Sequence, residues 1–216
     1  MAAFEQTLKK YTSKLDPNVV LKVYEGHFAT VHSHITKYFD FSTIKARRSE
    51  AMAAANILAD KYVNTTIVDT ILCMEGTEVI GAYLADRLTR NGIMSMNAHK
   101  TIYVVSPEMG TGGQMVFRDN NEFMIRGKNV VLLVASASTG GSIFQSTECV
   151  EYYGGHIAGV SAIFSAIPKV GNHEINSIFT AEDVPGYGTY KMKDCTYCRN
   201  KQKLDAIVNA YGYSKI

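Results

Sequence analysis

The stretch that decides the fold is NVVLLVASASTGGSIFQSTECVEYY, residues 129–153. Residues 129–135 form a short segment that is apolar and rich in β-branched residues from Val130 onward, which is typical of a central strand buried on both faces. A loop of small residues with two glycines follows, and a helix is expected from Ser142 to about Tyr153. The stretch therefore predicts a strand, a tight loop and a helix in direct succession.

The same order recurs on both sides of this stretch. Residues 66–74, 100–106 and 157–164 have the composition of strands, and an Ala-rich helix is predicted over 49–62. A second helix opens at Thr77, directly after the first of these strands. Strands that alternate with helices predict βαβ units and a mainly parallel sheet with helices on both faces. The predicted fold class is α/β, of a Rossmann-like kind.

The chain is interpreted as one domain over residues 1–216, in which the α/β core occupies 49–170. The flanking regions are 1–48 and a small appendage, 171–216. In the appendage, Leu204, Ile207, Val208 and Tyr211 repeat at helical spacing and predict a C-terminal helix that stops at Gly212. Residues 107–126 hold three glycines without periodicity and predict a long mobile loop or a small hairpin.

Composition excludes several classes of protein. The 216 residues carry 22 basic and 20 acidic side chains, a formal net charge of +2, which gives no basic footprint for nucleic-acid binding. The longest purely apolar run, 130–135, is far shorter than the roughly 20 residues that cross a bilayer. Because the first ten residues have no apolar stretch and four cysteines are too few for a disulfide framework, we expect a cytoplasmic protein with reduced thiols.

The loop after the central strand is the strongest candidate binding site. Small residues that lead from a strand into a helix offer free backbone N–H groups, the positive end of the helix dipole and hydroxyl groups, all of which suit a phosphate. The residues predicted to line it are Ala137, Ser138, Thr139, Gly140, Gly141 and Ser142. Ser142 with Gln145 also matches a capping box, so a purely structural turn is the alternative.

This arrangement resembles the phosphoribosyl-diphosphate (PRPP) signature of the type I phosphoribosyltransferases. More of the chain is similar to the orotate phosphoribosyltransferases of that superfamily, through GHF at 26–28, KYFD at 37–40 and DTILCMEGTEVIGAYLADRL at 69–88. The resemblance implies an N-terminal hood over 1–48, a homodimer, and Mg²⁺-dependent transfer of a nitrogen base to PRPP with release of pyrophosphate. Orotate as the base would place the protein in pyrimidine biosynthesis.

The resemblance also implies roles for individual residues. The 5′-phosphate would bind residues 137–142, and pyrophosphate would bind the turn formed by Glu75, Gly76 and Thr77. The acidic pair that contacts the ribose in the family falls on Val134 and Ala135 here. The family's mobile loop carries Lys and His, whereas residues 101–125 offer one cation, Arg118, and 161–168 have no Arg for an orotate carboxylate. These departures leave two functions open: a phosphoribosyltransferase, and a non-catalytic regulatory protein that binds PRPP or a nucleoside monophosphate.

The cysteines give a weaker signal. Cys195 and Cys198 form a CxxC, which is half of a zinc-ribbon pattern, while Cys73 and Cys149 fall in a predicted core strand and helix. A four-ligand zinc site would need His173, another distant histidine or a second subunit. Ordinary thiols are the alternative interpretation.

Overall fold

The computed structural model describes residues 3–90, 95–98, 100–110 and 114–216. Its main sheet has the strand order β10-β11-β9-β8-β4-β5, and every neighbouring pair is parallel except β10 with β11. The strands are β4 (Thr70–Cys73), β5 (Tyr103–Val105), β8 (Asn129–Ala137), β9 (His156–Ser165), β10 (Lys169–Val170) and β11 (His173–Thr180). The prediction of a mainly parallel α/β sheet is confirmed.

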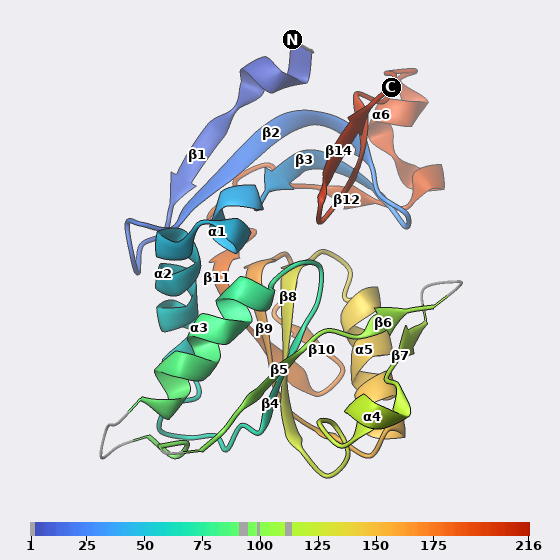
Figure 1. The fold of residues 1–216 in the computed structure, drawn as a ribbon. Coiled ribbons are helices and arrows are strands. Elements are labelled where there is room, and N and C mark those ends of the chain that lie inside the picture. Colours follow the sequence, from blue (N-terminus) through green and yellow to red (C-terminus); the bar gives the residue numbers. More distant parts are fainter. Residues whose placement is uncertain (1–2, 91–94, 99, 111–113) are drawn as a thin grey trace.

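Helices cover both faces of this sheet (Figure 1). The helices α2 (Arg48–Ala59) and α3 (Glu78–Thr89) pack on one face, and α5 (Gly141–Tyr152) packs on the other. Side chains of β8 alternate between the two: Val131 and Leu133 join the cluster under α2 and α3, and Leu132 and Val134 join the cluster under α5. The central strand is therefore buried on both faces, as its unbroken apolar run predicts.

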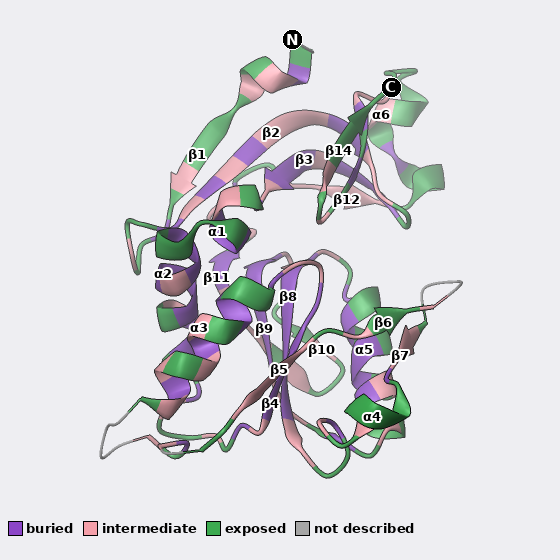
Figure 2. Ribbon diagram, in the orientation of Figure 1, coloured by how far each residue is buried: buried purple, intermediate pink, exposed green. Residues whose placement is uncertain are grey.

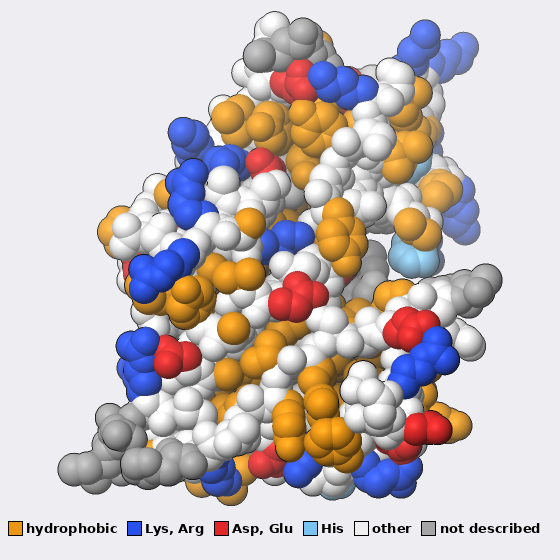
Figure 3. All heavy atoms as spheres, in the orientation of Figure 1, with side chains coloured by type: hydrophobic (Ala, Val, Ile, Leu, Met, Phe, Trp, Pro, Cys, Tyr) orange, Lys and Arg blue, Asp and Glu red, His pale blue; other side chains and the backbone are white. Residues whose placement is uncertain are grey.

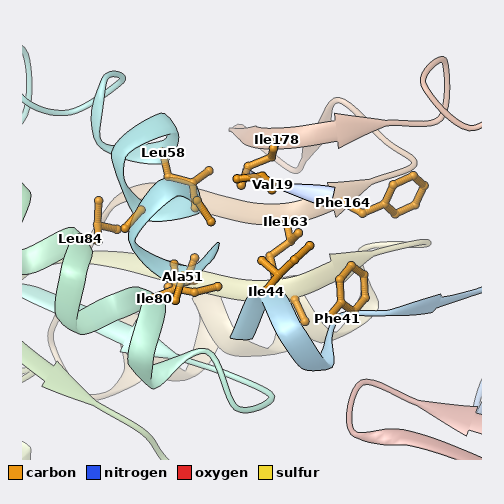
Figure 4. Packing of buried hydrophobic residues seen from close by; sticks show 14 of the residues in the cluster. Val19, Phe41, Ile44, Ala51, Leu58, Ile80, Leu84, Ile163, Phe164 and Ile178 are labelled. Carbon is orange, nitrogen blue, oxygen red and sulfur yellow. The ribbon is translucent and has the colours of Figure 1, made fainter. Parts of the chain in front are cut away.

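The cluster under α2 and α3 is the larger part of the core. Figure 4 shows Leu58 of α2 and Leu84 of α3 close to Ala51 and Ile80, with Ile163 of β9 and Ile178 of β11 alongside. Alanines at 51, 53, 54, 55 and 59 are buried, so the backbone of α2 comes close to its neighbours. The Ala-rich composition thus allows tight packing as well as favouring a helix.

A second sheet, called the hood from here on, lies over the carboxyl ends of the core strands (Figure 1) and includes strands from both 1–48 and 189–215. Its order is β12-β3-β2-β13-β14, and β1 also pairs with β2. The strands are β1 (Lys9–Thr12), β2 (Val20–Ala29), β3 (His34–Asp40), β12 (Thr189–Tyr190), β13 (Ala206–Asn209) and β14 (Gly212–Lys215). The two ends of the chain therefore build one sheet together. Figure 2 shows the contrast between buried stretches of β2 and β3 and the exposed β14.

The predicted C-terminal helix over 204–211 is wrong, because β13 and β14 form an antiparallel hairpin there. Ala206 and Val208 are buried while Ile207 and Asn209 are exposed, which is the alternation of a strand. β13 also pairs in parallel with β2, so a partner about 180 residues away in sequence decides its conformation.

Short elements complete the chain. The hairpin alternative for residues 107–126 is confirmed by β6 (Glu108–Met109) and β7 (Met115–Val116), after which α4 (Asp119–Glu122) follows. The remaining elements are the 3-10 helices η1 (Ala3–Thr7) and η2 (Met192–Asp194) and the helices α1 (Ser42–Ala46) and α6 (Thr196–Arg199).

Charged side chains of both signs share the surface. Lys and Arg side chains are scattered among acidic and neutral ones on the face shown in Figure 3, with no continuous basic stripe. In the part of the chain that the structure describes, none of the helices has the length and apolar character of a membrane span.

Gly81 shows how closely α3 packs on β4. A Cβ added at Gly81 would lie 2.3 Å from Cys73 Sγ and 3.2 Å from Val104 Cγ1. We expect Gly81→Ala to destabilise the protein by about 1–3 kcal/mol through overpacking, although alanine favours a helix by about 1 kcal/mol. Urea unfolding measures the effect. Adding Cys73→Ala removes the nearest atom, so the penalty of Gly81→Ala should shrink in that background; an equal penalty in both backgrounds would contradict the packing explanation.

Candidate functional site

The predicted phosphate loop lies at the carboxyl end of β8, where the chain enters α5. Gly140 is the N-cap residue with a φ of 81°, and no described side chain caps the helix. The capping box of Ser142 and Gln145 is therefore not formed. Thr139, Gly141 and Ser142 are exposed, and the first N–H groups of a helix have no intrahelical acceptor. The loop thus presents free donors and a positive dipole end to a ligand.

Neighbouring residues hold this loop in place. A Cβ on Gly140 would lie 2.4 Å from Val170 Cγ2 and 2.9 Å from Ile167 Cδ1, so β10 and the turn before it press on the glycine. Ser138 Oγ and the hydroxyl of Tyr187 are 2.8 Å apart. The Tyr187 ring packs against Phe164 of β9 and Phe39 of the hood, which fixes one wall of the loop from the other sheet.

The turn predicted to hold pyrophosphate follows β4. Glu75 and Gly76 both have left-handed φ values, 61° and 79°. The buried hydroxyl of Thr77 donates to the carbonyls of Met74 and Leu133 at 2.8 and 3.2 Å. The side chain of Thr77 therefore fastens the turn to β8, while the backbone at Gly76 remains partly exposed at the start of α3.

The carboxylate of Glu75 reaches the strand end at which the family's acidic pair would stand. Its Oε2 accepts a hydrogen bond from the backbone N–H of Ala135 at 3.2 Å. The residue before Glu75, Met74, donates its backbone N–H to the carbonyl of Leu133. The Glu75 carboxylate therefore adds one more hydrogen bond beyond the pairing of β4 with β8. Burial raises the pKa of Glu75, although hydrogen bonds from the backbone of Ala135 and Ser136 and the nearby charge of Lys45 oppose the shift. The backbone at Ala135, where the family's acidic pair would stand, thus contacts a carboxylate from the turn after β4.

Lys45 is a cation of this site that sequence reasoning missed. It lies in α1 and is buried, and its Nζ donates to the carbonyl of Glu75 and to the carbonyl of Ala210, each at 2.7 Å. The Tyr211 ring lies 5.1 Å from the same ammonium. Burial lowers the pKa of Lys45, partly offset by Glu75, Glu78 and Asp40. Lys45 joins the turn to the hood and to the C-terminal hairpin.

Arg118, the predicted loop cation, is already paired within the hairpin region. Its Nε and one terminal nitrogen donate to the two carboxylate oxygens of Glu108 at 2.7 and 2.5 Å, and both side chains are exposed. Such a two-point contact neutralises the guanidinium locally. A ligand that uses Arg118 would have to displace Glu108.

The structure brings Cys195 and Cys198 together with two histidines of the hood. His27 of β2, His34 of β3 and the two cysteines place four ligand atoms within 4.8 Å of one another. His27 and His34 are thus distant histidines of the kind that the zinc alternative needs, although no spacing in the sequence singles them out. His173, the named candidate, lies in β11 and is not part of this group. Cys73 and Cys149 are free thiols in the core strand β4 and in helix α5, as predicted.

Comparison with solved structures shows the fold. Adenine phosphoribosyltransferase from Thermoanaerobacter pseudethanolicus is 15% identical to this chain, with a TM-score of 0.50. The match covers 82% of this chain and 97% of the adenine enzyme. The Trypanosoma brucei enzyme, in complex with AMP, pyrophosphate and ribose-5-phosphate, is 14% identical with a TM-score of 0.52, covering 85% and 80%.

Orotate phosphoribosyltransferase from Mycobacterium tuberculosis H37Rv, in complex with PRPP, is 10% identical with a TM-score of 0.50, covering 68% of this chain and 83% of its own. No protein-family model and no curated protein matches the sequence. The chain therefore has the fold of the type I phosphoribosyltransferases, and the adenine and orotate enzymes resemble it about equally.

Proposed function

We propose that the protein transfers a phosphoribosyl group from PRPP to a nitrogen base. The observation that carries this proposal is the Glu75 carboxylate, which sits on the N–H of Ala135 at the end of β8, two residues before the phosphate loop. Two strand residues span about 7 Å, which is comparable to the length of a ribose. A phosphate on the loop of residues 137–142 would therefore leave the sugar beside a carboxylate.

The reaction needs negative charge near the ribose. As the bond between C1 of the ribose and the pyrophosphate oxygen breaks, positive charge develops on the sugar ring, and the new bond forms from the base nitrogen to C1. A preorganised carboxylate stabilises that charge in the transition state. Glu75 is the group at this edge that supplies it, and Lys45 supplies positive charge beside the turn at Gly76, where pyrophosphate would leave.

Mg²⁺ fits this arrangement. Protein sites hold Mg²⁺ through one or two carboxylates and mostly through the phosphates of the substrate, and Glu75 is a carboxylate at the predicted pyrophosphate turn. The ion would neutralise charge on the departing pyrophosphate. The site does not identify the base. The sequence resemblance favours orotate, whereas residues 161–168 have no Arg to pair with the carboxylate of orotate.

Turnover assays test the proposal. The purified protein is incubated with PRPP, Mg²⁺ and each of orotate, uracil, adenine, guanine and hypoxanthine, and pyrophosphate release is measured. Release with one base supports transfer. Calorimetric binding of PRPP or a nucleoside monophosphate without release from any base would replace transfer by the second function, a non-catalytic binding protein. The apolar pair Val134 and Ala135 and the Arg118–Glu108 contact favour that alternative.

Ser142→Asp tests the phosphate loop itself. Ser142 is exposed in the first turn of α5, so the new carboxylate would repel a phosphate and lower PRPP affinity about 10- to 100-fold. An acidic residue in a first helical turn stabilises a helix by about 0.3–1 kcal/mol, and we therefore expect the variant to unfold at a slightly higher urea concentration. Calorimetry and urea unfolding measure both effects.

Gln145→Glu is the matched control for this variant. It adds the same charge to an exposed position one turn further along α5, away from the loop. PRPP affinity should stay within about twofold of the unmodified protein. Equal losses in both variants would mean that residues 138–142 are not the phosphate site.

A further inference from the structure

We propose that His27, His34, Cys195 and Cys198 bind one Zn²⁺ ion, which joins the hood to the C-terminal part of the chain. This inference is independent of the proposed function, because the four residues lie on the hood and on residues 195–198, away from the phosphate loop and the turn at 75–77. The argument rests on the distances between the ligand atoms, on the protons that they carry and on their surroundings.

Four of the six distances between the ligand atoms are close to the edges of a zinc tetrahedron, and all six are within 4.8 Å. Zn–N bonds of about 2.0–2.1 Å and Zn–S bonds of about 2.3 Å at tetrahedral angles place two nitrogens about 3.3 Å apart and a nitrogen about 3.6 Å from a sulfur. His27 Nε2 lies 3.0 Å from His34 Nδ1, 3.4 Å from Cys195 Sγ and 3.7 Å from Cys198 Sγ. Cys198 Sγ lies 3.3 Å from His34 Nδ1.

Hydrogen bonds alone do not satisfy this cluster. Nδ1 of His27 lies 3.0 and 3.2 Å from the carbonyl oxygens of Gln202 and Lys203, and a carbonyl only accepts, so Nδ1 carries the proton. If Cys195 donates to His27 Nε2 and Cys198 donates to His34 Nδ1, the two imidazole nitrogens face each other at 3.0 Å with no proton between them. If His34 Nδ1 instead carries a proton and donates to His27 Nε2, neither thiol has an imidazole lone pair left to accept its proton. A cation between the four atoms uses every lone pair.

The surroundings of His27 have the features of a metal ligand's environment. A histidine that binds a metal through one nitrogen commonly donates the other N–H to a carbonyl or carboxylate, which orients the ring. The strand β2 has an irregular register between Glu25 and Phe28, and the backbone N–H of His27 donates to Asp205 Oδ2 at 2.7 Å. The bulge and the contact with Asp205 therefore aim the ring at the cysteines.

The ligand set favours zinc in a structural role. Two thiolates and two imidazoles in tetrahedral arrangement are typical of zinc, and four protein ligands leave no open position for a substrate. His27, His34 and Cys195 are buried, and Cys198 lies at the exposed edge. The site links β2 and β3 to α6, and so closes a loop between residues 168 positions apart in sequence.

Metal analysis of the purified full chain is the first test. After dialysis against metal-free buffer we expect about one Zn²⁺ per chain by mass spectrometry of the metal. Replacing it with Co²⁺ should give the strong visible absorption of a tetrahedral thiolate complex. Chelation should lower the melting temperature and expose two thiols to a thiol reagent; burial raises the pKa of Cys73 to about 12 and also raises that of Cys149, so these two should react slowly.

Two pairs of variants separate ligation from general damage. Cys198→Ser and His34→Gln should lose stoichiometric zinc, whereas Cys149→Ser and His32→Gln should keep it, because Cys149 lies in α5 and His32 is exposed in the turn between β2 and β3. Cys198→His keeps a ligand at the exposed corner, so it should retain zinc while its Co²⁺ complex loses part of the thiolate absorption.

The proposal fails if the folded, unmodified chain neither contains zinc nor takes up Co²⁺ with a tetrahedral spectrum. It also fails if Cys198→Ser and His34→Gln retain as much zinc as their controls. Because PRPP turnover is measured separately, an inactive protein that still holds zinc would overturn only the proposed function.

Discussion

Glu75→Gln is expected to lower the rate of phosphoribosyl transfer about 100- to 1000-fold, the usual effect of removing one preorganised electrostatic group. The amide keeps the size of the side chain and can still accept the hydrogen bond from Ala135, so the loop and the turn should keep their shape. The charge that faces the ribose is lost. We expect kcat to fall while KM for PRPP changes little, because the charge acts on the transition state.

The same substitution should stabilise the fold at neutral pH. Burial raises the folded-state pKa of Glu75 above its ordinary value of 4.5, so ionisation costs folding free energy at any pH above the raised value. The amide has no such cost. The gain in urea midpoint should therefore be full at pH 7 and disappear as the pH falls through the raised pKa toward 4.5, where both states of the unmodified protein become protonated.

Glu78→Gln is the control for both effects. Glu78 is exposed at the start of α3 and accepts a hydrogen bond from Ser106 at 2.7 Å. The variant therefore removes a negative charge that is three residues from Glu75 but contacts Ser106 and not β8. Its kcat should stay within about threefold of the unmodified enzyme, since an exposed charge is screened by solvent. Unchanged turnover in Glu75→Gln would reject the role given to its carboxylate.

Gly140→Ala is expected to destabilise the protein by about 2–4 kcal/mol and to weaken PRPP binding at least about tenfold. The glycine has a φ of 81°, a conformation that alanine adopts at a cost, and its new Cβ would meet Val170 Cγ2 at 2.4 Å. The loop has to move to relieve that contact, and the N–H groups at 141–143 move with it. Urea unfolding and calorimetry measure the two losses.

Gly171→Ala separates the two causes. Gly171 also has a left-handed φ, 57°, yet a Cβ there would meet nothing within 4 Å, so this variant shows the conformational cost alone. We expect Gly171→Ala to lower the free energy of unfolding by about 1 kcal/mol and to leave PRPP affinity unchanged. Combining Gly140→Ala with Val170→Ala should recover part of the affinity. A double variant that binds no better than Gly140→Ala would show that contact with β10 does not position the loop.

The core of this fold could be predicted because its signals are local. The run from Val130 to Ala135 is apolar on both faces, four small residues and two glycines follow it, and the helix begins at the second glycine, Gly141. Strand, loop and helix were thus predicted nearly at their observed bounds. The proposed carboxylate was also predictable in part, since Glu75 was recognised in its turn, but its contact with Ala135 depends on the pairing of β4 with β8.

The rest depends on contacts between distant residues. The segment 204–211 has a helical repeat in sequence, yet the open edge of β2 pairs with it and makes it a strand. Lys45 and Tyr187 carry no local sign of a function, because their partners are a turn and a loop on the other sheet. His27 and His34 lie about 160 residues from the cysteines, so no spacing rule for zinc sites detects the four together.

The hood sheet has a consequence for the order in which the chain folds. β2 leaves the ribosome long before β13, the strand that pairs with its end, because His27 and Asp205 are 178 residues apart. The parallel core between them has mostly shorter-range pairings and can form while synthesis continues. During that interval β1 can pair with Val20–Val23, but the edge of β2 at Phe28 and Ala29 lacks the strand that later pairs with it and is open to other chains. Aggregation during synthesis is therefore the hazard built into this topology, and pairing of β13 with β2 removes it.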